Sequence, residues 1–152
     1  MIQRKQTLYL IAALILTISC LCLPLGTFTD VSALKTTDTL YNLWIVGENG
    51  KSYFSVWALF AVLLVTCPIA IISIFMYHNR IVQSRFCMFN ILLIIGWYII
   101  LFVIVLNMKS SSAEFKMSVP VIFPALSLIL YVMARKAILS DEALVKAADR
   151  IR

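Results

Sequence analysis

The sequence predicts an all-α membrane protein, a bundle of four transmembrane helices with a small outer β-hairpin loop and a cytoplasmic amphipathic C-terminal helix. Of its 152 residues, 62% are hydrophobic and 13% are charged, whereas soluble domains have about 45–50% apolar and about 25% charged residues. The apolar residues form uncharged blocks long enough to cross a hydrocarbon core of about 30 Å. A short basic segment, residues 77–86, divides the blocks into two pairs. We therefore expect one transmembrane domain over residues 1–152.

The first span is expected at about residues 7–25. No charged residue occurs between Gln6 and Thr29, and Pro24 and Gly26 favour the end of the helix there. A cleaved signal peptide is the alternative, but the stretch has no Ala-x-Ala pattern. A lipoprotein cleavage box before Cys20 is also weak, because the expected leucine is missing.

A loop of residues 26–54 follows, and its second half is typical of a β-hairpin. Residues 40–46 and 51–54 are rich in aromatic and β-branched side chains, and Asn49-Gly50 supplies the positive φ of a tight turn. Two strands alone are marginal in water, so we expect the hairpin to rest on the membrane surface or on helix ends. Four aromatic residues fit a belt at the membrane interface, namely Tyr41, Trp44, Tyr53 and Trp57.

The remaining spans are expected at about residues 54–77, 86–108 and 117–135. Residues 109–116 read as a short polar turn between the last two. Residues 137–152 read as a separate cytoplasmic tail helix capped by Ser140, with Asp141 and Glu142 in its first turn. Glu142 and Lys146 are spaced for an ion pair on one helical face.

Charge predicts the orientation. Four spans place both termini and residues 77–86 on one side of the membrane. Nine of the 13 basic residues, including every arginine, and three of the seven acidic residues fall on that side, which therefore carries the whole net charge of +6. Because basic residues favour the cytoplasmic side, both termini are expected in the cytoplasm. This distribution also explains the basic composition without a nucleic-acid-binding surface.

Asn90, Trp97 and Tyr98 form a candidate in-membrane pocket, since their polar groups need partners in a dry core. The alternative is hydrogen bonding between helices that pack around Gly96. No Asp, Glu, Lys or Arg falls inside a predicted span, since Arg135 only closes the last one, and this argues against a proton-coupled pump.

The tail offers a second candidate site. It could dock a cytoplasmic partner through charged residues, namely Asp141, Glu142, Asp149 and Arg150. Alternatively, it could lie on anionic lipid through its basic residues, and the two interpretations are compatible.

No stretch carries a recognisable catalytic, cofactor or metal site. The four cysteines lack metal-ligand spacing and are expected to be small buried hydrophobic residues. A quinone-linked thiol oxidase would need two cysteine pairs at the outer face, which this spacing does not provide. His78 is the single histidine and is expected at the membrane surface.

Both ends of the sequence resemble a family of small bacterial four-span inner-membrane proteins that is carried as a domain of unknown function. The resemblance rests on the opening residues 1–10, MIQRKQTLYL, and the closing residues 141–152, DEALVKAADRIR. It implies a multi-pass protein of the bacterial inner membrane and supplies no activity, ligand or catalytic residue.

The sequence therefore favours a non-enzymatic accessory or scaffold subunit of a membrane complex, without a cofactor, which contacts the bilayer and a membrane-protein partner. The alternative is a carrier or binding protein for an apolar or lipid-like small molecule.

Overall fold

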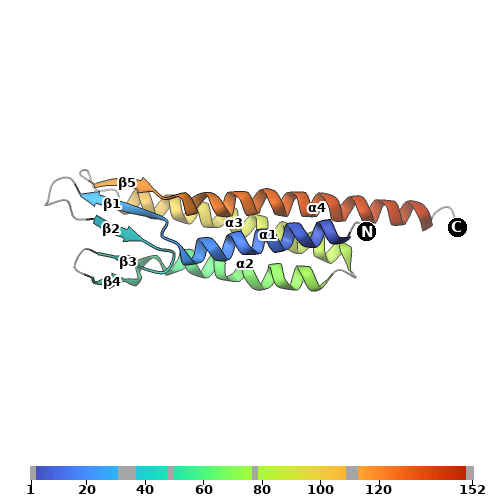
Figure 1. Ribbon diagram of the computed structural model, residues 1–152, viewed down its shortest axis with the longest axis horizontal. Coiled ribbons are helices and arrows are strands. Elements are labelled where there is room, and N and C mark those ends of the chain that lie inside the picture. Colours follow the sequence, from blue (N-terminus) through green and yellow to red (C-terminus); the bar gives the residue numbers. More distant parts are fainter. Residues whose placement is uncertain (1–2, 31–36, 48–49, 77–78, 109–112, 150–152) are drawn as a thin grey trace.

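The computed structural model describes residues 3–30, 37–47, 50–76, 79–108 and 113–149, and it shows a helix bundle with a small sheet at one end (Figure 1). The helices are α1 (Gln3–Cys22), α2 (Trp57–Phe75), α3 (Arg80–Met108) and α4 (Ile122–Asp149). Each helix packs on the next in sequence, and α4 packs on α1 to close the bundle. We call the two ends of the bundle the sheet end and the terminal end, the latter being where α1 begins and α4 ends.

Small and polar side chains fill much of the bundle interior. In α3 the buried positions follow a spacing of three and four residues through Cys87, Asn90, Ile94, Trp97 and Leu101, which is the spacing of helices packed at a shallow angle. The other helices bury small or polar residues at similar spacing, namely Gln6, Ala13, Thr17, Thr66, Ala70, Ser73, Ser127 and Ala134. Small side chains let helix backbones approach closely.

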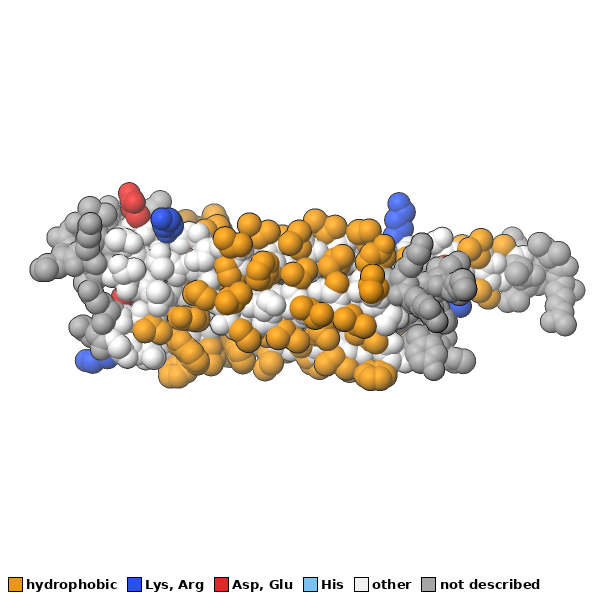
Figure 2. All heavy atoms as spheres, in the orientation of Figure 1, with side chains coloured by type: hydrophobic (Ala, Val, Ile, Leu, Met, Phe, Trp, Pro, Cys, Tyr) orange, Lys and Arg blue, Asp and Glu red, His pale blue; other side chains and the backbone are white. Residues whose placement is uncertain are grey.

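Large apolar side chains lie on the outside. They form a broad belt around the helices (Figure 2), with Leu8, Phe75 and Phe102 each more than 60% exposed. Three helical segments are long and apolar enough to cross a membrane: Phe54–Phe75, Arg80–Met108 and Val119–Ala147. α1 contains a shorter apolar helix, Gln6–Cys22. An apolar surface of this extent is foreign to soluble monomers and marks a protein suited to a bilayer.

The sheet has five antiparallel strands in the order β4-β3-β2-β1-β5. The strands are β1 (Gly26–Asp30), β2 (Thr37–Leu40), β3 (Ile45–Val46), β4 (Ser52–Tyr53) and β5 (Ala113–Met117). The predicted hairpin is present as β3 and β4, with Ile45 opposite Tyr53. Gly50 has the expected positive φ of 70°, while Asn49 lies outside the described residues.

Several predicted boundaries are wrong. The segment 109–116 was expected to be a polar turn, but residues 113–117 form β5, which pairs along β1 with Phe28 opposite Phe115. Leu40 belongs to β2 and not to the hairpin, because the chain turns between Tyr41 and Trp44. Residues 80–86 belong to α3, because Gln83 and Ser84 are buried in the bundle and extend the helix beyond its apolar part.

The C-terminal tail is not a separate helix. α4 begins at Ile122 after a short 3-10 turn (Val119–Val121) and continues without interruption to Asp149. Ser140, the predicted cap, lies within this helix. The reason is local packing, because Ile138 and Asp141 are buried against the bundle on either side of Ser140 and keep the helical path. The final turns of α4 project beyond the other helices at the terminal end (Figure 1).

Gly26 provides a test of the sheet. A Cβ atom at this position would lie 2.8 Å from the Lys116 carbonyl oxygen and 2.5 Å from the Phe115 ring. Gly26→Ala is therefore expected to lower the free energy of unfolding by about 1–3 kcal/mol, as overpacking does elsewhere. Thermal unfolding of the protein purified in detergent measures the change.

Gly96→Ala is the matched control. A Cβ atom at Gly96 would meet nothing within 4 Å, and alanine favours a helix over glycine by about 1 kcal/mol. The control should unfold at the same temperature as the unaltered protein or higher. Equal destabilisation by both substitutions would contradict the role given to the β1–β5 contact.

Candidate functional site

Trp97 is tied to the loop between β2 and β3. Its indole Nε1 donates to the Asn42 side-chain oxygen at 3.2 Å, and the Asn42 amide donates to the backbone carbonyl of Cys20 at 2.7 Å. All three residues are fully buried. Asn42 thus joins α3, α1 and the sheet at one point, so Trp97 serves the packing of the sheet end and does not line an open pocket.

Tyr98 faces a different part of the bundle. Its hydroxyl donates to the Val121 carbonyl at 2.6 Å, where the chain enters α4, and its ring meets the Trp97 ring edge-on with centroids 5.0 Å apart. Beside it, α3 and the start of α4 form a wholly apolar groove of about 490 Å³. The other groove residues are Leu101, Phe102, Val105, Met117, Val121, Ile122 and Ala125. Of the three predicted pocket residues, Tyr98 alone lines this groove.

Asn90 lies about two helical turns, or ~10 Å, from Trp97 along α3. Its amide faces the Tyr131 hydroxyl of α4. Both side chains are fully buried, and neither Asn90 polar atom nor the Tyr131 hydroxyl reaches a hydrogen-bond partner within the described residues. Asn90 therefore belongs to a polar layer at mid-bundle, and the structure does not bring it together with Trp97 and Tyr98.

The predicted docking residues have different surroundings. Asp141 is 7% exposed, and its carboxylate accepts a hydrogen bond from the buried side chain of Gln6 in α1. Glu142 forms the predicted ion pair with Lys146 at 2.8 Å. Asp149 is the last residue of α4, and Arg150 lies outside the described residues. Asp141 thus holds α4 to α1 and is not presented at the surface.

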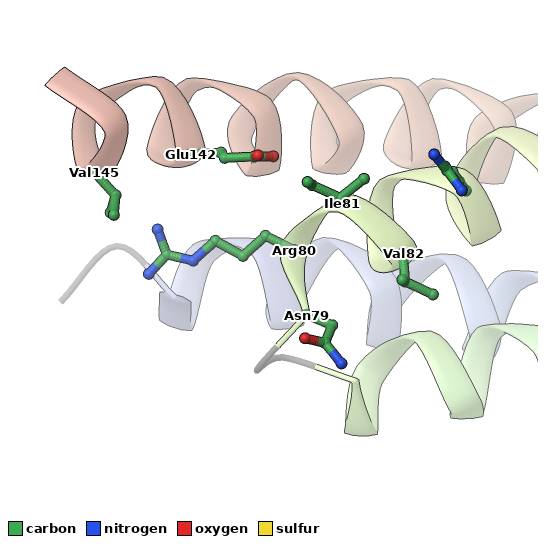
Figure 3. A pocket seen from close by; sticks show the side chains of 7 residues that line it. Asn79, Arg80, Ile81, Val82, Glu142 and Val145 are labelled. Carbon is green, nitrogen blue, oxygen red and sulfur yellow. The ribbon is translucent and has the colours of Figure 1, made fainter. Parts of the chain in front are cut away.

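A pocket of about 550 Å³ lies at the terminal end, between the start of α3 and the projecting part of α4 (Figure 3). We call it the arginine pocket, and it is lined by Asn79, Arg80, Ile81, Val82, Arg85, Glu142 and Val145. The Arg80 side chain extends toward Val145 of α4 (Figure 3), and its Nη1 donates to the backbone carbonyl of Asp141 at 3.3 Å. From the sequence, the arginines are expected only as charges at the membrane surface, and the fold shows that they share a cavity with α4.

The cysteines are all free thiols. Cys20 and Cys87 are buried and Cys67 is half-buried, but Cys22 is exposed, which corrects the expectation that all four are buried. Within the described residues, no three His, Cys, Asp or Glu side chains lie close enough to hold a metal ion. His78 lies outside the described part of the chain.

Sequence reasoning missed Asn42, Gln6 and Tyr131. Asn42 interrupts an aromatic and β-branched segment, and Gln6 directly precedes the apolar part of α1. Isolated polar residues in such settings are a usable signal, because a buried amide must find a partner. For Tyr131, nothing in the sequence except its position near the middle of a span indicates a buried polar group.

The two buried asparagines should respond differently to leucine. Asn42→Leu removes bonds to Trp97 and Cys20 and leaves both partners unsatisfied, which should cost about 2–3 kcal/mol of stability. Asn90→Leu removes an amide without a protein partner and should be neutral or stabilising. Thermal unfolding in detergent compares the two. A loss for Asn90→Leu as large as for Asn42→Leu would show that the Asn90 amide is satisfied in the folded protein.

Comparison with known proteins assigns nearly the whole chain to one family. No curated protein matches it significantly. Residues 2–151 match the family described as a domain of unknown function (DUF4293). This agrees with the resemblance seen at the two ends of the sequence, and the chain belongs to this family.

Proposed function

We propose that the protein spans a bacterial inner membrane four times, with both termini in the cytoplasm. The apolar part of α1, Gln6–Cys22, gives ~26 Å of helix, which is at the short end of the range for a transmembrane helix. Its outer face is as apolar as those of the longer helices, with Leu8, Ile11, Ile15 and Ile18 exposed. The excess of basic residues at the terminal end supports the orientation.

Within this membrane, we propose a non-enzymatic accessory or scaffold subunit of a membrane complex. The observation that carries this proposal is the projecting end of α4. The helix has 28 residues, or ~42 Å, so its last turns extend well beyond the length of α1. Because it continues along the direction of the span, this segment is better placed to meet a cytoplasmic protein than to lie flat on lipid.

The exposed face of the projecting segment is apolar at its centre. Leu144 is 60% exposed, and Ser140 and Ala147 lie on the same helical face, one turn away on either side. An exposed leucine on an unpartnered helix is a typical anchor for a helix-in-groove contact. We therefore place the partner contact at Leu144, and not at Asp141 as the charges of the sequence suggested.

A carrier for an apolar molecule is the second candidate. The groove beside Tyr98 favours it, because its lining is entirely apolar and it opens on the outer surface of α3 and α4. Trp97 and Asn90 do not contribute to this groove, so the support is narrower than the sequence implied.

The orientation is tested by reporter fusions to the C-terminus of the full chain. Green fluorescent protein should fluoresce, since it matures in the cytoplasm, and alkaline phosphatase should be inactive. The reverse pattern, or extraction of the protein by alkaline carbonate, would contradict the proposed membrane placement.

The subunit proposal is tested by purification in mild detergent from native membranes. A stoichiometric partner should accompany the unaltered protein and fall about tenfold with Leu144→Gln, because a buried leucine contributes about 1.5–3 kcal/mol. Quantitative mass spectrometry measures the ratio. Ala143→Gln is the matched control, since it adds the same amide at the neighbouring exposed position without removing an apolar anchor.

Two outcomes would contradict the subunit proposal. One is protein recovered without any stoichiometric partner. The other is a bound apolar molecule in place of a protein, which would favour the carrier.

A further inference from the structure

The arginine pocket combines two cationic side chains with an apolar wall. Arg80 and Arg85 lie one and a half turns apart at the start of α3, while Ile81, Val82 and Val145 supply apolar surface. A cavity of about 550 Å³ is large enough for a phosphate group with its glycerol attachment. Its chemistry therefore suits an amphiphile with an anionic head.

The positive charge of the pocket is not cancelled by the acids around it. Among the described residues, neither Arg80 nor Arg85 forms a salt bridge. The Asp141 carboxylate is turned to Gln6, and Arg80 meets only its backbone carbonyl. Glu142 lines the pocket, but its carboxylate is paired with Lys146 at 2.8 Å. Guanidinium groups without carboxylate partners are well suited to phosphate, which they bind through paired hydrogen bonds.

The backbone adds to this preference. The pocket is lined by residues 79–82, which form the first turn of α3 and the residue before it. The first amide groups of a helix have no acceptor within it, and the helix dipole favours an anion there. The amides and the two arginines thus favour the same kind of ligand.

The surface next to the pocket favours a lipid over a free anion. Met88 and Phe89 follow Arg85 by three and four residues, so they lie on the same face of α3. Both are about half exposed, and Leu92 continues the apolar strip at 56% exposure. An acyl chain attached to a phosphate in the pocket would run along this strip within the apolar belt.

We propose that the arginine pocket binds the phosphate headgroup of an anionic phospholipid, with the acyl chain lying along Met88, Phe89 and Leu92. The inference rests on the proposed membrane placement but not on the proposed protein partner. It differs from a tail helix lying on lipid, because the lipid binds between α3 and α4 and contacts the projecting helix from the side.

The test uses full-length protein stripped of lipid in detergent and native mass spectrometry with added phosphatidylglycerol or phosphatidylcholine. The unaltered protein should retain the anionic lipid in preference to the zwitterionic one. Arg80→Gln with Arg85→Gln should reduce that preference about tenfold, through loss of the charged hydrogen bonds. The matched control is Lys116→Gln with Lys136→Gln, which removes the same charge from exposed positions outside the pocket and should keep the preference.

If the double variant fails to fold because Arg80 is needed for folding, Arg85→Gln alone still tests the proposal. Arg85 is exposed, so its substitution should not disturb the packing of the bundle. It should lower the preference several-fold without changing the unfolding temperature of the lipid-free protein. The proposal is overturned if the unaltered protein shows no preference, or if the arginine variants keep it. It is also overturned if millimolar inorganic phosphate displaces the lipid completely, which would make the pocket a site for a soluble anion. The reporter fusions separately reveal a failure of the membrane placement.

Discussion

The close approach of four helices through small and polar side chains is the constraint on which the structure depends. Small residues such as Ala13, Ala70 and Ala134 are buried between the helices, and many of the leucines, isoleucines and phenylalanines of each helix face outward. In water this arrangement would be costly, but next to lipid tails it loses nothing, because apolar side chains gain little by leaving hydrocarbon. The same arrangement leaves polar groups inside, where each must find a partner or remain unsatisfied. Close helix packing therefore helps to explain both the apolar outer surface and the polar groups in the interior.

Much of the helical layout could be predicted from the sequence, because uncharged blocks and their basic flanks are local signals. The hairpin of β3 and β4 was also predictable, since Gly50 and the β-branched residues beside it are close in sequence. The pairing of β1 with β5 was not, because it joins segments about ninety residues apart, as in Gly26 opposite Met117. The uninterrupted α4 was missed for a related reason. Ser140 is a good capping residue locally, and burial of Asp141 against α1 overrides that preference.

The candidate sites also depend on contacts between distant segments, which local sequence signals do not predict. Trp97, Tyr98 and Asn90 were correctly identified as polar groups that need partners, but the partners of Trp97 and Tyr98 come from a loop and a helix start that no spacing rule connects to α3. Asn90, Trp97 and Tyr98 are close together in sequence, but each contacts a different part of the bundle. Arg80 and Arg85 were read only as charges that orient the protein. Their shared cavity depends on how far α4 extends past them, which is a property of the tertiary structure.

The pairing of β1 with β5 has a consequence for biosynthesis. β1 emerges from the ribosome directly after α1, but β5 follows only after α2 and α3 have been made. Until then one edge of β1 has no strand beside it, and unpaired edges are the usual starting points for wrong associations. Its length of five residues and its polar threonines at positions 27 and 29 reduce that risk. The sheet is thus completed only after α3 has been made, and β5 then joins the strand that follows α1 to the segment that leads into α4.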